Sequence, residues 1–246
     1  MSPGPVFHRF GLAHLTIIVL TIALPFALAK IVRITASRRV ERLIAFSLGG
    51  LLLLNYVGYI VYVRRFNAVT WPQILPLQLC DWAMFVIVVA MWTGRRRWFE
   101  IAYFWGIGGT LQAIITPNLQ FGFPDLRFVS FFVAHSAIII GITFLMLVHR
   151  FRPYPGSIVR TLVWTEIYFV ITFTTDLLNG VNYGFLLHKP EAFSLLSYLS
   201  DERWLYILQM HGLAWLFFVV LYVPFAIYDV TKAELIRKPG NQGAEI

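Results

Sequence analysis

Long apolar stretches, interrupted by short clusters of charged residues, prolines and glycines, dominate the pattern of the chain. Each stretch has about 20 residues, the length that an α-helix needs to cross the hydrocarbon core of a bilayer. A segment in lipid must satisfy its backbone hydrogen bonds internally, so each stretch is expected to be helical. The pattern predicts seven transmembrane helices, over residues 8–29, 40–63, 74–92, 98–116, 127–148, 158–178 and 204–228.

The composition also indicates a polytopic membrane protein rather than a soluble domain. Of the 246 residues, 59% are hydrophobic and 13% are charged, whereas a soluble domain has about 25% charged residues. We therefore predict an all-α fold with one transmembrane domain over residues 1–246 and short tails at 1–7 and 232–246. The connection over residues 179–203 includes an apolar stretch at 193–199, and we expect this connection to dip into the membrane interface.

Lysine and arginine residues are unequally divided between the two sides of the predicted bundle. The segments after the first, third, fifth and seventh helices carry 14 of them, and the opposite side carries 6. Because basic loops stay in the cytoplasm, we predict an outer N-terminus and a cytoplasmic C-terminus. We attribute the net charge of +8 to these basic residues in the loops and at the level of the lipid headgroups. A nucleic-acid partner is not expected, since the sequence has no basic-aromatic module of the RNA-binding kind.

Several polar side chains fall at one depth inside the predicted helices. At the rise of an α-helix, Cys80 lies about 9 Å below the outer boundary, His211 about 10 Å and His135 about 12 Å. Gln112 and Asp176 approach the same level from the outer ends of their helices. Polar and ionisable groups within a membrane are costly, so their agreement in depth predicts a functional site in the outer half of the bundle.

Cys80 and His135 have the chemistry for nucleophilic catalysis. Cys80 is the one cysteine of the chain, which excludes an intramolecular disulfide and a cysteine-rich zinc site. A buried thiol becomes nucleophilic when an imidazole takes its proton, and Asp176 or Asn179 is a candidate to orient that imidazole. A thiolate at this depth would lie near the ester carbonyls of a phospholipid, which suits acyl transfer through a thioester and requires no metal or cofactor.

Three segments carry a resemblance to a known family: LPLQLC at 75–80, FFVAH at 131–135, and GVNY at 180–183 with the following KP at 189–190. In these segments, and over about residues 55–224, the chain resembles the YwaF-like bacterial integral membrane proteins, a family that includes the vertebrate transmembrane protein 164. The resemblance implies a coenzyme-A-independent acyltransferase of the bacterial inner membrane that acts on phospholipids and lysophospholipids. It also implies that Cys80 is acylated and that His135 is the base, while Gln78 stands where many relatives have histidine.

Other polar residues near the same level or in the outer connections are expected to support the site or to bind substrate: Gln78, Gln112, Asn118, Asp176, Asn179, Asn182, Tyr183 and His211. Two other classes of function remain open. In a metal-dependent membrane lipid hydrolase, His14, His135 and His211 would bind zinc and leave one position open for water. In a transporter or small-ligand receptor, Asp176 and Glu166 would be the coupling groups.

Overall fold

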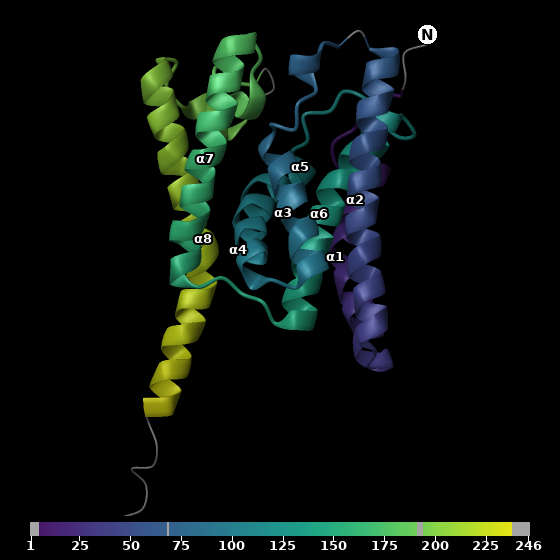
Figure 1. The fold of residues 1–246 in the computed structure, drawn as a ribbon, viewed down its shortest axis with the longest axis vertical. Coiled ribbons are helices and arrows are strands. Elements are labelled where there is room, and N and C mark those ends of the chain that lie inside the picture. The colour runs from purple at the N-terminus through teal and green to yellow at the C-terminus, as the bar shows by residue number, and fades with distance from the viewer. Residues whose placement is uncertain (1–4, 68, 191–193, 238–246) are drawn as a thin grey trace, which may run out of the picture.

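The computed structural model describes residues 5–67, 69–190 and 194–237 of the chain. Helices run back and forth between the two ends of the molecule (Figure 1). We call the end at which α1 begins the N-terminal end, and the end at which α2, α4 and α7 begin the basic end. The elements are α1 Leu12–Thr35, α2 Arg38–Phe66, η1 Trp71–Gln73, α3 Leu79–Thr93, α4 Arg96–Trp105, η2 Gly106–Thr110, α5 Leu111–Ile115, α6 Leu126–His149, α7 Pro155–Asn179, η3 Tyr183–Phe185, η4 Leu195–Tyr198 and α8 Arg203–Arg237.

The helices make seven passes in alternating directions, because α4, the π-helical turn η2 and α5 follow one another as a single pass. Five helices, α1, α2, α6, α7 and α8, are long and apolar enough to cross a membrane. The third pass, α3, has 15 residues and is therefore about 22 Å long, shorter than the hydrocarbon core of about 30 Å. The non-helical residues that precede α3 supply the remaining length of this pass.

Three helices differ from their predicted bounds by more than three residues at one end or both. The first helix spans Leu12–Thr35 instead of 8–29, because Lys30 and Arg33 can extend their charged ends toward water without breaking the helix. The third begins at Leu79 instead of residue 74, because a residue before a proline disfavours the helical conformation and Pro76 follows Leu75. The last continues to Arg237 instead of ending at 228, so part of the predicted tail is helical.

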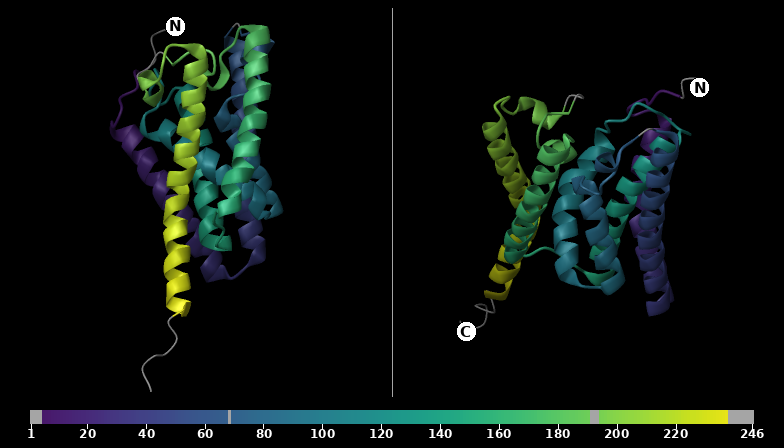
Figure 2. Two further views of the ribbon diagram at one scale, coloured as in Figure 1. Left: turned by 90° about the vertical axis from the view of Figure 1, so that its left-hand side faces the viewer. Right: turned by 45° about the horizontal axis from the view of Figure 1, so that its top comes forward.

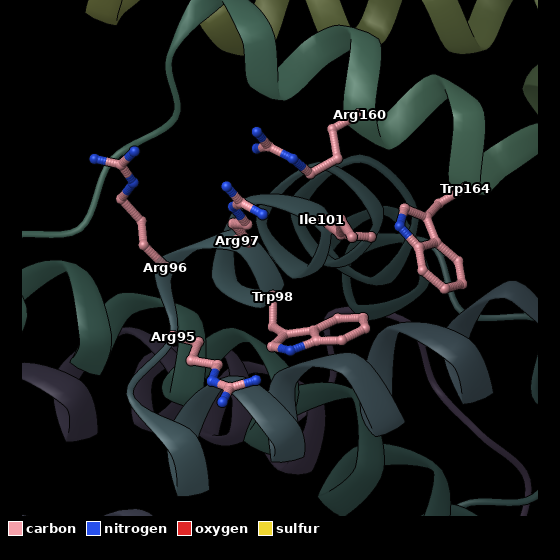
Figure 3. Close-up of a pocket in the computed structure, with 7 residues that line it drawn as sticks. All are labelled: Arg95, Arg96, Arg97, Trp98, Ile101, Arg160 and Trp164. Atoms are coloured by element: carbon pink, nitrogen blue, oxygen red, sulfur yellow. The ribbon is translucent and has the colours of Figure 1, made fainter.

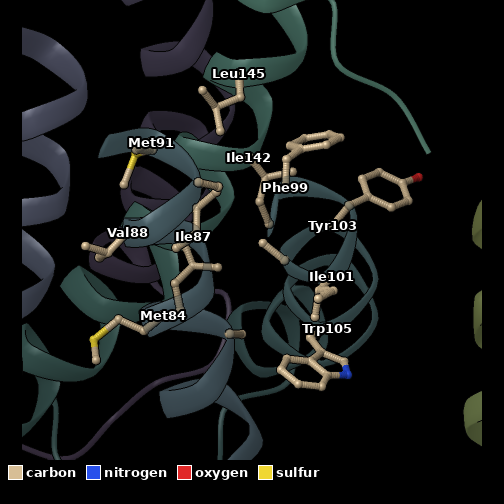
Figure 4. Packing of buried hydrophobic residues seen from close by; sticks show 14 of the residues in the cluster. Met84, Ile87, Val88, Met91, Phe99, Ile101, Tyr103, Trp105, Ile142 and Leu145 are labelled. Carbon is tan, nitrogen blue, oxygen red and sulfur yellow. The ribbon is translucent and has the colours of Figure 1, made fainter. Parts of the chain in front are cut away.

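The core lies between α3, α4 and α6 (Figure 4). Two glycines allow these helices to approach closely. A Cβ at Gly106 would lie 2.3 Å from Ile142 Cδ1, and a Cβ at Gly141 would lie 3.0 Å from Met91 Sδ and 3.2 Å from Ile87. Small residues at helix contacts are typical of membrane proteins, in which close backbone packing replaces the hydrophobic driving force.

Helices α7 and α8 form a pair beside this core, on the side away from α1 and α2 (Figures 1 and 2). Polar and small hydroxyl side chains face the bundle from α7: Ser157, Thr161, Thr165, Tyr168, Thr172 and Asp176. Many of its large apolar residues are exposed on the outer surface, as are many of those of α1, α2 and α8. This inside-out arrangement is expected where lipid covers the outer surface, because polar groups are then most stable between helices.

Candidate functional site

The chain enters α3 through a non-helical segment, residues 74–78, so α3 begins well inside the bundle, below the ends of α2 and α7 (Figure 1). Side chains satisfy the carbonyl groups of this segment. The Trp82 indole donates to Pro76 O at 3.0 Å, and the Tyr168 hydroxyl donates to Leu77 O at 3.0 Å. Non-helical backbone is stable at membrane depth only where protein groups satisfy it, so these two bonds fix the recessed start of α3.

Cys80 is the second residue of α3, and its side chain is partly buried. Its position can be related to α6 through Ile87, which lies against Gly141. Residues seven apart share a helix face, so Cys80 lies on the side of α3 that faces α6. The backbone N–H groups of Cys80 and Asp81 lie next to the sulfur. The thiol thus lies at the first turn of a helix, whose dipole favours negative charge, while burial and the neighbouring Asp81 carboxylate oppose it. The Asp81 N–H also donates to Gln78 O at 3.0 Å.

His135 lies on α6 at about the same level as Cys80. Both helices run toward the basic end, and from the Ile87–Gly141 contact Cys80 is about 10 Å and His135 about 9 Å nearer the N-terminal end. Six residues of helical rotation turn His135 by about 120° from Gly141. Its ring is therefore not aimed directly at α3, and no hydrogen bond joins Cys80 to His135 in the described part of the chain.

A backbone carbonyl fixes the tautomer of His135. Its Nδ1–H donates to Phe131 O at 2.7 Å, and the imidazole stacks on the Phe131 ring with 4.1 Å between the ring centres. In the neutral imidazole this bond leaves Nε2 without a proton, as an acceptor. The orienting group is therefore the Phe131 carbonyl, while Asp176 and Asn179 bond elsewhere.

The connection after α7 binds the entry segment of α3 through Gln78 and Tyr183. The Gly184 N–H donates to Gln78 Oε1 at 3.1 Å, and the Tyr183 hydroxyl donates to Pro72 O at 2.7 Å. Asp176 is fully buried and accepts the Tyr183 N–H on Oδ1 at 3.0 Å, while Oδ2 has no hydrogen-bond partner among the described residues. Three of the predicted supporting residues, Gln78, Asp176 and Tyr183, thus lie together at the start of α3.

The other predicted supporting residues lie apart from this group. Asn182 closes its own loop, donating to His188 O and accepting from two N–H groups. Asn179 and Gln112 are exposed and bond within their own helices, to Thr175 O and Thr116 Oγ1. Asn118 is exposed in the connection between α5 and α6. Part of the apolar stretch predicted to enter the interface, residue 193, lies outside the described residues.

The structure does not bring the three histidines of the zinc alternative together. His14 accepts the Phe10 N–H on Nδ1 and donates from Nε2 to Ile114 O, so both ring nitrogens have protein partners. His211 Nε2 is 3.3 Å from Glu166 on the neighbouring helix. Among the described residues, no group of three histidine, cysteine, aspartate or glutamate side chains could hold a metal ion.

Tyr168 and Trp82 are the residues of the site that the sequence reasoning missed. Tyr168 is 5% exposed and precedes Thr172 and Asp176 by four and eight residues on one face of α7. This polar spacing of four within an apolar helix is a signal that the sequence does contain. Trp82 gave no comparable signal, because its bond to Pro76 depends on the non-helical path of the chain before α3.

Comparison with known proteins places the chain in a family. No curated protein and no solved structure matches it. The family model for the TMEM164 family matches residues 9–222, which include all of α1 to α7, the first part of α8 and the whole neighbourhood of Cys80. The chain therefore belongs to the TMEM164 family.

Proposed function

We propose that the chain is an integral membrane acyltransferase that moves a fatty acyl group between phospholipids through a thioester on Cys80. The observation that carries the proposal is the place of Cys80 at the recessed start of α3, level with His135 on the adjacent helix. The resemblance of the segments around Cys80 and His135 to a family with acyltransferase activity supports the same function.

In the first half-reaction, His135 Nε2 accepts the thiol proton and the Cys80 thiolate attacks the ester carbonyl of a phospholipid. The ester C–O bond breaks, the thioester C–S bond forms, and the departing lysophospholipid oxygen takes the proton from His135. In the second half-reaction a lysophospholipid hydroxyl gives its proton to His135 and attacks the thioester. The acyl group moves to the new oxygen, and the proton returns to the thiol.

The backbone around Cys80 supports this chemistry electrostatically. Each half-reaction passes through a tetrahedral intermediate with a negatively charged oxygen, which N–H donors stabilise strongly in a site that excludes water. The N–H groups of Cys80 and Asp81, at the start of α3, lie close to the Cys80 sulfur and are candidate donors of this kind. Because Cys80 and His135 are not in hydrogen-bond contact, substrate entry must include a rotation of one of the two side chains.

The partners that fit this site are membrane phospholipids and lysophospholipids. The outer surface of the bundle is apolar, so a lipid ester can approach α3 from the bilayer without crossing water. With the N-terminal end outside, the site would act on lipids of the outer leaflet of a bacterial inner membrane. Hydrolysis is the competing outcome, because water could attack the same thioester.

The test is acyl transfer by the purified protein from a diacyl phospholipid to an isotope-labelled lysophospholipid, measured by mass spectrometry. We expect Cys80→Ala to abolish transfer and His135→Ala to reduce it about 100-fold or more. The double variant should lose little beyond either single one, because the two residues act as a unit. His149→Ala is the matched control, a histidine on the same helix whose Nε2 is 3.1 Å from Glu41 at the basic end.

Three results would overturn the proposal. One is full activity of Cys80→Ala. Another is an equal loss in His135→Ala and His149→Ala, which would indicate damage to α6 rather than loss of a base. The third is release of free fatty acid with no labelled diacyl product, which would make the protein a lipid hydrolase.

A further inference from the structure

An open cavity of about 690 Å³ lies at the basic end of the bundle, between the starts of α4 and α7 (Figure 3). The cavity lies beyond the C-terminal end of α3, whereas Cys80 lies at the N-terminal end of that helix. The cavity is therefore separate from the site proposed for acyl transfer. Four arginines and two tryptophans form most of its lining: Arg95, Arg96, Arg97, Arg160, Trp98 and Trp164.

The charges around this cavity are not balanced by the protein. Glu100, which is 1% exposed, is bound by Arg96 at 3.0 Å and by Arg160. No acidic side chain in the described residues pairs with Arg95 or Arg97. The cavity therefore has four guanidinium groups and one carboxylate, which pairs with only two of them. Several like charges around one cavity repel one another and attract a counter-ion of opposite sign.

The geometry directs two of these charges into one space. Glu100 holds Arg160 of α7 against α4, and the Arg97 and Arg160 side chains both reach into the space between the two helices (Figure 3). The cavity also lies at the first turn of α4, a ten-residue helix whose dipole would favour an anion at this end. Guanidinium groups bind the oxygens of a phosphate in a planar, two-pronged manner.

Apolar side chains form the other walls of the cavity. The Trp98 and Trp164 rings lie 5.8 Å apart, and Ile101 continues the apolar surface toward the core. Tryptophan is typical of the level of lipid headgroups. A free phosphate ion would use only the arginines, whereas a lipid would also cover the tryptophans and Ile101 with its glycerol and upper acyl carbons.

We propose that this cavity binds the phosphate headgroup of an anionic phospholipid in the leaflet at the basic end, with its upper acyl carbons against Trp98 and Trp164. Basic pockets between transmembrane helices are suited to anionic headgroups. The proposal concerns binding alone and does not depend on the acyltransferase chemistry, so Cys80→Ala protein should bind this lipid as the wild type does.

The experiment measures binding of phosphatidylglycerol, phosphatidylcholine and inorganic phosphate to the purified full chain, by native mass spectrometry and titration. We expect phosphatidylglycerol to bind more tightly than phosphatidylcholine, and millimolar phosphate not to displace it. Arg95→Gln/Arg97→Gln should weaken phosphatidylglycerol binding roughly 30-fold, from the usual contribution of two basic residues. Both residues are exposed, so the fold should not depend on them.

A matched control separates this cavity from the general basic charge of this end. Arg38 and Arg39 are exposed at the start of α2 at the same end, outside the cavity. Arg38→Gln/Arg39→Gln removes the same charge and should keep binding within about twofold of wild type. If Arg95→Gln/Arg97→Gln proves unstable, Arg97→Gln alone should still weaken binding about fivefold.

Equal losses in the two double variants would overturn the proposal, because they would indicate diffuse attraction to an anionic surface. Equal affinity for phosphatidylglycerol and phosphatidylcholine would overturn it as well. Displacement of the lipid by millimolar phosphate would assign the cavity to the free ion instead.

Discussion

Gly184 lies where the connection after α7 meets the entry to α3, through the bond from its N–H to Gln78. Its φ is +59°, and a Cβ at this position would lie 2.5 Å from Tyr168 Oη. That hydroxyl donates the hydrogen bond to Leu77 O. In Gly184→Ala the hydroxyl must move, so the carbonyl of Leu77 loses its partner inside the bundle.

The cost has two parts. A left-handed conformation costs a non-glycine residue about 1–2 kcal/mol, and a buried carbonyl that loses its hydrogen bond costs about 1–3 kcal/mol. We therefore expect Gly184→Ala to lose about 2–5 kcal/mol, or about 5–15 °C in the Tm of the detergent-solubilised protein. Gly156→Ala is the matched control, because no atom lies within 4 Å of its added Cβ.

A double-mutant cycle tests the reasoning more sharply. Tyr168→Phe removes the oxygen that the new methyl group meets, and the next ring atom, Cζ, lies 3.6 Å from the Cβ position. In the Tyr168→Phe background, Gly184→Ala should therefore cost only the backbone strain, about 1–2 kcal/mol. An unchanged Tm for Gly184→Ala, or the same loss with and without the Tyr168 hydroxyl, would refute this account.

Three further predictions concern pH, topology and metal. The hydrogen bond from the Arg127 guanidinium holds the pKa of Asp125 below its ordinary value, so its stabilising effect is present above about pH 4 and is lost as the pH falls through the lowered pKa. Asp125→Asn should remove that part of the pH dependence of Tm. The same Tm at every pH in Asp125→Asn and in the wild type would contradict a stabilising role of the Asp125–Arg127 pair. A periplasmic reporter should be active when fused after Asn67 and inactive after Gly94, and the reverse pattern would invert the proposed topology. Chelators should leave acyl transfer unchanged, whereas loss with recovery on adding zinc would favour the hydrolase alternative.

The number and order of the passes could be predicted from the sequence because a membrane span is a local property. About 20 apolar residues between charged clusters define a span whatever its neighbours are, and the observed helices have the seven predicted passes. The start of α3 was predicted wrongly because hydropathy cannot distinguish an extended apolar segment from a helical one. Pro76 was the available signal.

The candidate site was predictable only in part. Depth along each helix can be counted from the sequence, and Cys80 and His135 do lie at about one level. Rotation about the helix and contacts between distant segments cannot be counted in this way. The bond from Gly184 to Gln78, for example, joins residues 106 apart in the chain. The tautomer of His135 likewise depends on a backbone carbonyl, which every helix offers.

The arrangement around α3 explains why a short helix suits this site. A full-length helix would place its first-turn N–H groups at the membrane surface, in water. Because Pro76 delays the helix to Leu79, its first turn lies inside the bundle, with the Cys80 and Asp81 N–H groups close to the sulfur. Buried donors stabilise developing negative charge more strongly than exposed ones do.

The covalent intermediate on Cys80 is the most direct test of the proposed mechanism. Purified wild-type protein is incubated with a diacyl phospholipid, without lysophospholipid acceptor, and its intact mass and peptide masses are measured. The account predicts one acyl group in thioester linkage to Cys80, which is released by hydroxylamine and discharged when lysophospholipid is added. The adduct should be absent from Cys80→Ala and strongly reduced in His135→Ala. Acyl transfer without any adduct on Cys80, or an acyl adduct that persists in Cys80→Ala, would contradict the central claim.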